Sequence, residues 1–220
     1  MPDPEQLQGV ATFLYEMGHL KRSARTGWWL AGVQDPESVA EHSHRTALIA
    51  ALLAMLEGAD PGRAALLALF HDTQETRTGD IPSVGKAYLQ EAEHTAITAD
   101  QTAAFPEKVG RAVLELVEEY EGRESVEAQL ARDADKLECL IQAREYQVQG
   151  YTDVPPWVET SAAAVKSDSA RELARLAQEL PPSIWWQAFV AGVYQRQGLM
   201  PPNVAVTVDP EMPDRATDRD

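Results

Sequence analysis

The pair His71-Asp72 is the clearest chemical feature of the sequence, because it follows directly on a strongly apolar segment. Residues 64–70 read Ala-Ala-Leu-Leu-Ala-Leu-Phe, which is too apolar for a helix on the protein surface. We therefore expect the pair to lie at the edge of a buried region. A buried carboxylate without a partner is costly, so Asp72 should face a metal ion or a tight hydrogen-bond network.

Other residues of metal-binding type precede and follow this pair. His42, His71, Asp72 and a later aspartate would supply two imidazoles and two carboxylates. This set suits Mn²⁺, Fe²⁺, Co²⁺ or Mg²⁺ with positions left for water, and it does not suit a closed structural zinc site. Glu75 lies one helical turn beyond Asp72. A His-Asp pair is common by chance and Glu75 alone reads as a surface carboxylate, so these residues indicate metal chemistry only in combination.

The helix that carries the later aspartate begins after Ser125, a residue type that caps helices. Two aspartates on it, Asp133 and Asp135, are candidates for the fourth ligand. Asp133 continues the apolar stripe that includes Leu130 and Leu137 better than Asp135 does. Helical spacing alone therefore favours Asp133.

Helix start signals predict the elements that position the two histidines. Asp35-Pro36 and Asp60-Pro61 each combine a capping aspartate with proline at the first helical position, so we expect helices to begin there. Gly79 with Pro82 marks the following turn. Further helices are expected over residues 4–19 and 83–105, after Pro106, after Ser125, over about 156–180, and after Pro181-Pro182. No stretch alternates with period two, which predicts an all-α fold: a single helical bundle.

Length and composition favour one domain, residues 1–200, followed by a Pro- and Asp-rich acidic tail, residues 201–220, that we expect to be disordered. The longest apolar run is too short to span a bilayer, and the N-terminus does not resemble a signal peptide. A single cysteine, Cys139, excludes an internal disulfide. We expect a cytoplasmic protein without a membrane partner.

The net charge of −16 argues against binding to long nucleic acid, because it repels a polyphosphate backbone. Small phosphates remain possible ligands, since a divalent ion and one or two basic side chains can make a local positive site.

Four short stretches form a more specific pattern. They are Val39-Ala-Glu-His42, His71-Asp72 with Glu75, Thr78-Gly-Asp-Ile-Pro82 and Asp135-Lys-Leu-Glu138. Together they resemble the HD-domain metal-dependent phosphohydrolases, and within these the 5′-deoxynucleotidase branch. The resemblance extends over roughly residues 7–146, and the C-terminal third carries no matching motif.

The resemblance implies that one divalent ion, Mn, Co, Fe or Mg, is held by His42, His71, Asp72 and Asp135. The motif around Asp135 selects it over Asp133. The catalytic acids of the family match Glu75 and Asp80, and both residues are present. We expect Glu75 to orient or deprotonate a water for in-line attack on phosphorus.

The resemblance also implies an activity: hydrolysis of deoxynucleoside 5′-monophosphates to deoxynucleoside and phosphate. One alternative is a nucleotide triphosphohydrolase of the same superfamily. Another is a non-catalytic, metal-stabilised sensor or interaction module, although the presence of both Glu75 and Asp80 argues against it.

Residues 21–29 are basic and aromatic in an otherwise acidic chain. The resemblance implies that an Arg and a Trp in this segment contact a nucleotide, and Arg25 with Trp28 is the nearest match. Trp29 is the fallback, and a plain core-filling role for the tryptophans is the alternative. The family further implies a homodimer, for which Trp185, Trp186 and Phe189 near the C-terminus offer an apolar patch.

Overall fold

The computed structural model describes residues 3–90 and 92–196. Within these ranges the regular structure is helical, and the one β-type pairing is an isolated bridge between Ala24 and Ser38. This confirms the all-α fold class. The helices are α1 (Pro4–Met17), α2 (Gly27–Leu30), α3 (Val39–Glu57), α4 (Pro61–Phe70), α5 (Glu75–Thr78), α6 (Ser83–Lys86), α7 (His94–Thr102), α8 (Glu107–Gly122), α9 (Val126–Val148), α10 (Pro155–Ala164), α11 (Asp168–Glu179) and α12 (Ile184–Arg196).

The chain divides after Glu179 into two compact units. The second unit contains α12, on which Trp185 and Phe189 are exposed. The domain predicted for residues 1–200 stays a prediction, and the tail predicted for residues 201–220 lies outside the described residues. No helix in the described part of the chain is long and apolar enough to cross a membrane.

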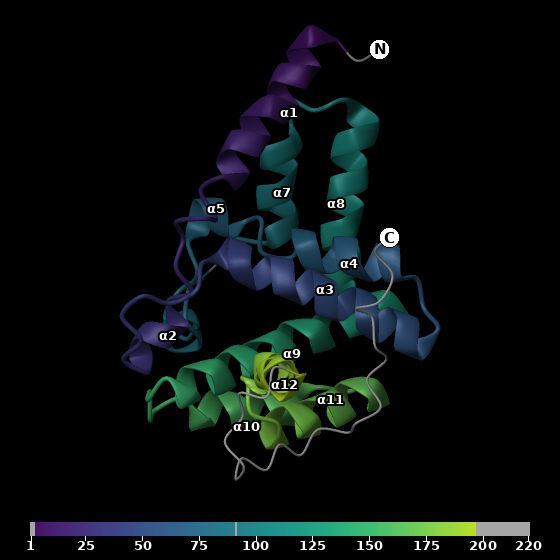
Figure 1. The fold of residues 1–220 in the computed structure, drawn as a ribbon. Coiled ribbons are helices and arrows are strands. Elements are labelled where there is room, and N and C mark those ends of the chain that lie inside the picture. Colours follow the sequence, from purple (N-terminus) through teal and green to yellow (C-terminus); the bar gives the residue numbers. More distant parts are fainter. Residues whose placement is uncertain (1–2, 91, 197–220) are drawn as a thin grey trace. The chain divides into compact units, whose positions relative to one another are not determined.

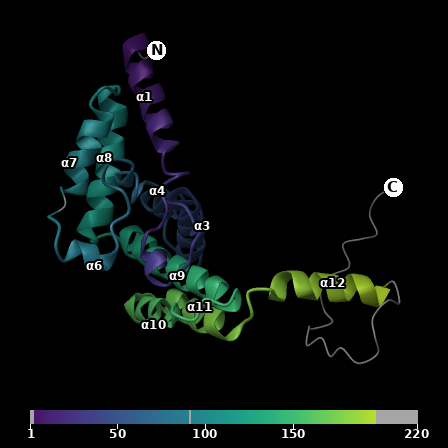
Figure 2. The ribbon, with the colours of Figure 1, turned by 90° about the vertical axis from the view of Figure 1, so that its left-hand side faces the viewer.

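Helices α3, α4 and α9 form the centre of the first unit. Figure 1 shows α1, α7 and α8 on one side of this centre and α10 with α11 on the other, and Figure 2 gives the same layering after a quarter turn. Helix α9 packs against α3 and α4 as well as α10 and α11, so it is buried from two sides. Fully buried leucines fill the contacts, among them Leu53, Leu67, Leu137 and Leu140.

Helix α3 begins later than predicted, and this sets the place of His42. Its N-cap is Ser38, whose hydroxyl accepts the Glu41 N–H while the Glu41 carboxylate accepts the Ser38 N–H. The predicted start at Asp35-Pro36 is wrong, because Arg25 N–H donates to Glu37 O and holds this stretch extended. The reciprocal cap then starts the helix one turn before His42.

Other start signals are confirmed. Asp60 accepts the N–H groups of Gly62 and Arg63 at the start of α4, and Ser125 accepts the Ala128 N–H at the start of α9. Pro106 precedes α8 directly. Asp60 and Ser125 satisfy backbone donors that have no partner within the helix, whereas Pro106 makes no side-chain cap.

Two predicted helices are broken in the structure. Among the described residues of the stretch 83–105, helix is confined to α6 and α7. In α7, Thr98 and Gln101 bond to Gln74 and Thr73 of the neighbouring segment. Buried contacts, and not the intrinsic helix propensity of this stretch, determined the length of its helices. The stretch 156–180 breaks between α10 and α11, where Asp133 accepts the N–H groups of residues 166 and 167 at 2.9 and 2.7 Å.

Candidate active site

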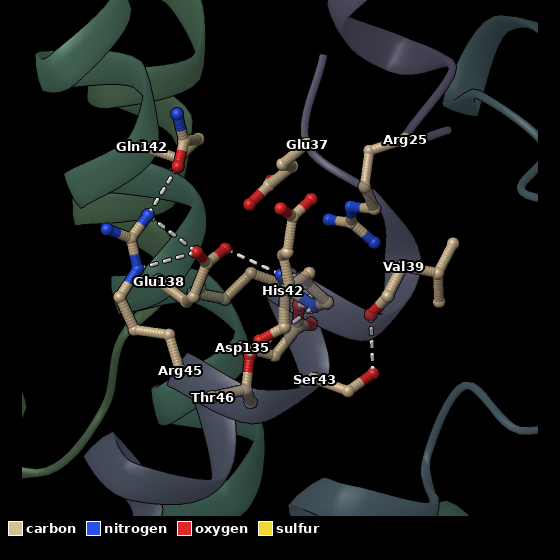
Figure 3. Close-up of polar contacts among 12 residues, drawn as sticks. Arg25, Glu37, Val39, His42, Ser43, Arg45, Thr46, Asp135, Glu138 and Gln142 are labelled. Carbon is tan, nitrogen blue, oxygen red and sulfur yellow. Dashed lines mark hydrogen bonds and ion pairs between the residues drawn. The ribbon is translucent and has the colours of Figure 1, made fainter. Parts of the chain in front are cut away.

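His42 stands in the second turn of α3 and is fully buried. Its Nδ1 lies 2.5 Å from Oε2 of Glu138 on α9. Because a carboxylate accepts, Nδ1 carries the hydrogen, and Nε2 faces the site, 3.3 Å from Asp135 Oδ1 and 3.7 Å from Asp72 Oδ2. Figure 3 shows His42 placed between the two acids of α9. The imidazole is thus oriented as a metal ligand would be.

His71 is held in the same way at the C-terminal end of α4. Its Nδ1 lies 2.6 Å from the carbonyl oxygen of Ala68, so Nδ1 must donate. Its Nε2 lies 3.0 Å from Oδ2 of Asp72. In both histidines, Nδ1 donates a hydrogen bond on the side of the ring that faces away from the site. This bond holds the ring so that Nε2 points toward the carboxylates of the cluster.

The four predicted ligands are brought together from three elements: α3, the end of α4, and α9. One ligand atom each from His42, His71 and Asp135 lies within 4.8 Å of the others. Asp72 is outside this three-residue group, but its Oδ2 lies 3.7 Å from His42 Nε2 and 3.0 Å from His71 Nε2. His71 Nε2 and Asp72 Oδ2 are buried and have no hydrogen-bond partner, although they face each other. Acceptor atoms that converge in this way fit a shared divalent cation, and the mixed nitrogen and oxygen set fits Mn, Fe, Co or Mg.

Asp133, the alternative candidate, lies elsewhere. Its buried carboxylate accepts the backbone N–H groups of Lys166 and Ser167 and is absent from the cluster. On a helix, two residues apart means side chains about 200° apart, so Asp133 and Asp135 leave opposite sides of α9. The structure thus brings Asp135, and not Asp133, to the two histidines.

Charges in the cluster are strongly coupled. Burial alone would raise the pKa of Asp72, but the charges of His71 and His42 lower it below its usual range. Burial opposes charge on Asp135 too, yet the hydrogen bond with His42 holds its pKa well below normal. Burial would lower the pKa of His42, whereas its contacts with Asp135 and Glu138 raise it to about 10. Both carboxylates are therefore in the charged form that metal ligation needs, whereas the His42 imidazole would release a proton when a metal binds to its Nε2.

Glu75 is the buried acid at the start of α5, and its Oε2 has no hydrogen-bond partner. Burial and then the charges of Asp72 and Asp80 raise its pKa to about 9. The cation expected at Asp72 would offset part of this effect. Glu75 faces the same cavity as the predicted ligands Asp72 and Asp135.

Asp80 follows Gly79, whose φ of +73° favours glycine, and the turn aims the Asp80 carboxylate at the segment that carries Arg25. Its Oδ2 accepts the N–H of Thr26 at 2.5 Å and the hydroxyl of Thr26 at 2.9 Å. The Arg25 guanidinium lies 3.9 Å from Asp80 Oδ1 and 3.5 Å from Asp72 Oδ2. Asp80 therefore fixes the loop that places Arg25 beside the cluster.

Trp28 belongs both to the core and to the cavity wall. It is 2% exposed, and its Nε1 donates to Glu37 Oε1 at 3.0 Å. Its ring centroid lies 5.2 Å from that of Tyr146, edge to face, and 5.6 Å from that of Trp157. Trp29 is 55% exposed and does not line the cavity. Of the two tryptophans, Trp28 is the one beside the site.

A cavity of about 540 Å³ connects these groups. One part of its wall is apolar and aromatic, and the other part carries the acids and Arg25. Its lining residues include Arg25, Trp28, Leu30, Asp72, Glu75, Asp80, Asp135, Cys139 and Trp157. Such a cavity can hold a flat apolar group beside an anion, close to the candidate metal ligands.

Glu138 and Arg45 are the functional residues that sequence reasoning missed. Glu138 is fully buried, and Arg45 donates to it through Nε at 2.9 Å, with a second guanidinium nitrogen 2.8 Å away. Arg45 also contacts Gln142 and Glu145, which completes a chain of polar groups behind His42 (Figure 3). The available signal was the spacing: Glu138 lies one turn after Asp135, so two acids share one face of a buried helix.

Known proteins resemble this chain in sequence and in fold. The family model described as HD domain matches residues 17–180. The chain belongs to the HD domain family.

Two named relatives and one solved structure are similar to this chain. The chain is similar to 5'-deoxynucleotidase HDDC2 of Homo sapiens, at 36% identity over 142 residues, which is 64% of this chain and 69% of the relative. It is similar to 5'-deoxynucleotidase of Erwinia tasmaniensis, at 30% identity over 60% of this chain and 72% of that one. A conserved hypothetical protein from Pyrococcus furiosus aligns in structure with a TM-score of 0.64 and 32% identity, over 77% of this chain and 99% of that chain.

Proposed function

We propose that the chain is a metal-dependent phosphomonoesterase that hydrolyses deoxynucleoside 5′-monophosphates to deoxynucleoside and phosphate. The observation that carries the proposal is that His42, His71 and Asp135 converge, with Asp72 beside both imidazoles, next to a cavity lined by Asp72, Asp135, Arg25, Glu75 and two tryptophans. The relatives named 5'-deoxynucleotidase support the substrate class.

The proposed metal ligands are His42, His71, Asp72 and Asp135. A divalent ion bound by them would supply positive charge that polarises a phosphoryl group and lowers the pKa of water. Glu138 and the Ala68 carbonyl hold the two imidazoles in the orientation that ligation requires. The chain's own groups thus determine where the phosphate is held.

Glu75 is the proposed general base, in the carboxylate form that a cation bound beside Asp72 would favour over the protonated form. It takes a proton from a water that attacks phosphorus, while the bond between phosphorus and the 5′ oxygen breaks on the opposite side. The proton then becomes available to the leaving 5′ oxygen, so the products are the nucleoside and inorganic phosphate. Arg25 donates to a phosphate oxygen, and Asp80 keeps Arg25 in place through Thr26.

Trp28 is the proposed sugar-selective residue. Its ring is fixed from three sides by Glu37, Tyr146 and Trp157, so it cannot move aside for a larger substrate. A 2′-hydroxyl pressed against it would be buried without a hydrogen-bond partner, which is unfavourable. Deoxyribonucleotides should therefore be preferred.

The test is a phosphate-release screen with deoxynucleoside and ribonucleoside mono- and triphosphates, each with Mn²⁺, Co²⁺, Fe²⁺ and Mg²⁺. Product analysis separates this activity from that of a triphosphohydrolase, because only the former yields nucleoside and orthophosphate from dAMP. Absence of release from every nucleotide and metal would favour the sensor or interaction module. The homodimer and the cytoplasmic location remain predictions, and the homodimer is checked by light scattering.

A further inference from the structure

A second cavity, of about 580 Å³, lies against the same side chains. Its lining residues include Glu93, His94, Tyr120, Glu121, Arg123 and Arg132. It shares Asp72, Lys86, Asp135 and Lys136 with the first cavity. The candidate metal ligands Asp72 and Asp135 therefore stand in a wall common to both cavities, and a group bound at the ion can be approached from either side.

The two cavities differ in chemistry. The first contains two tryptophans, Trp28 and Trp157, together with other apolar side chains. In the second, nearly all lining side chains are polar or charged, and Tyr120 is the one aromatic ring that is not a histidine. A nucleoside therefore fits the first cavity better, and a small hydrated ion fits the second better.

The charges of the second cavity favour an anion. Four Lys and Arg side chains line it: Lys86, Arg123, Arg132 and Lys136. A bound divalent ion would compensate the charges of Asp72 and Asp135, so that Glu93 and Glu121 are the remaining acids. One of the four, Lys136, places its Nζ 2.9 Å from Asp135 Oδ2, next to the cluster. In a chain with net charge −16, this local excess of positive charge is selective for a small anion.

One arginine that lines the second cavity, Arg132, is already oriented. Arg132 donates to Tyr120 O at 3.1 Å and to Glu121 Oε2 at 2.9 Å, and its guanidinium lies 4.4 Å from the centre of the Tyr120 ring. Glu121 is shared with His94, whose Nδ1 lies 3.1 Å from its other oxygen. A guanidinium held in this way can donate to an oxyanion with little further loss of side-chain freedom.

We propose that the second cavity is a binding subsite for phosphate oxyanions, and that inorganic phosphate occupies it on the side of the metal cluster opposite the nucleoside. This inference rests on the proposed function, which requires a phosphate at the cluster. The same oxyanion chemistry would accept the outer phosphates of a nucleoside triphosphate. One experiment therefore tests free phosphate and a phosphate chain as two separate probes.

The experiment measures the binding of inorganic phosphate to the metal-loaded protein by calorimetry. Arg123→Asn removes an exposed cation and suits the backbone, because Arg123 has φ of +59° and asparagine tolerates this conformation. Arg132→Gln removes the oriented guanidinium. The matched control is Arg111→Gln, on α8, which removes an exposed arginine that does not line the cavity.

We expect phosphate binding to weaken roughly twofold to fivefold in Arg123→Asn, an exposed charge, and roughly tenfold or more in Arg132→Gln. The control should be unchanged. Unchanged affinity in Arg123→Asn would overturn the proposal, whatever the effect of Arg25→Gln, because Arg25 is already expected to contact a phosphate held at the ion. Circular dichroism confirms folding, and Arg123→Asn carries the test alone if Arg132→Gln does not fold.

Tripolyphosphate is the second probe. Binding at least tenfold tighter than that of phosphate, with the same sensitivity to Arg123→Asn, identifies a subsite for a phosphate chain; equal or weaker binding identifies a subsite for the free product. Neither measurement involves turnover. Failure of the proposed function would instead appear as no phosphate release from dAMP, so the two failures are distinguishable.

Discussion

The Nδ1 atom of His42 lies 2.5 Å from Oε2 of Glu138, and both side chains are fully buried. The same carboxylate accepts from Arg45, which neutralises its charge in the protein interior. This arrangement fixes which imidazole nitrogen faces the metal-type cluster. It makes Glu138 a positioning residue for the proposed ligand.

Replacement of Glu138 tests this relationship. Glu138→Gln should lower the affinity for Mn²⁺ roughly 10- to 100-fold, because one amide oxygen cannot replace two carboxylate oxygens that accept from His42 and Arg45. Calorimetric titration of the metal-free protein with Mn²⁺ measures this affinity. Glu145→Gln is the control, since Glu145 contacts Arg45 and not His42. A change of less than twofold in Glu138→Gln would contradict the assigned role.

The two aspartates of α9 should respond in opposite ways. Asp135→Asn should lose most of the bound metal, whereas Asp133→Asn should keep the metal and lose about 1 kcal/mol of unfolding free energy, because its carboxylate caps the segment before α11. Metal analysis and urea unfolding provide the two readouts. Loss of metal in Asp133→Asn alone would show that the ligand assignment is wrong.

Glu75 is expected to contribute to turnover and not to metal binding. Glu75→Gln keeps the size of the side chain but cannot accept a proton, so the rate on dAMP should fall by roughly 10²- to 10⁴-fold. Metal content should remain that of the wild type. Glu118→Gln, at an exposed position on α8 that lines neither cavity, serves as the control. A loss of activity below tenfold would rule out general base catalysis by Glu75.

Sugar selectivity should depend on Trp28. The wild-type protein should prefer dAMP over AMP by roughly 10- to 100-fold in kcat/KM, the effect of burying an unpaired hydroxyl. Trp28→Phe is smaller and loses the bond to Glu37, so this preference should shrink. Trp29→Phe, at an exposed position, should leave it unchanged. Equal rates on dAMP and AMP in the wild type would refute the selectivity.

Stability in acid should depend on Glu16. Its carboxylate accepts from Arg77, Gln101 and Thr76 and links α1 to α5 and α7. The bond from Arg77 is the largest cause of a pKa lowered to about 2. A lowered folded-state pKa means that this stabilisation is present above about pH 4.5 and is lost as the pH falls toward about 2.

Glu16→Gln should therefore reduce the unfolding free energy by about 1–2 kcal/mol at neutral pH, a value discounted for partial exposure of the Arg77 pair. The difference from the wild type should shrink when urea unfolding is repeated near pH 3. A difference that is independent of pH would mean that the carboxylate charge does not contribute.

The sequence by itself determined the helical class and most helix starts. Capping residues act locally: Asp60 and Ser125 satisfy backbone donors within one turn, so their effect can be read from neighbouring residues. The sequence also determined that His71-Asp72 ends an apolar helix, but the structure buries only the face with Ala64, Leu67 and Ala68 and leaves Leu66 and Leu69 exposed. The family motif, and not periodicity, selected Asp135.

Tertiary structure decided what depends on distant partners. Helix α9 is buried against α3 and α4 on one side and α10 and α11 on the other, so its apolar pattern does not distinguish the face of Asp133 from that of Asp135. The start of α3 likewise depends on backbone pairing of residues 23–25 with residues 37–39. The residues next to the helix start do not reveal this pairing, because its other half lies earlier in the chain. The pairing of His42 with Glu138 joins residues 96 positions apart, and only the packing of α3 on α9 brings them into contact.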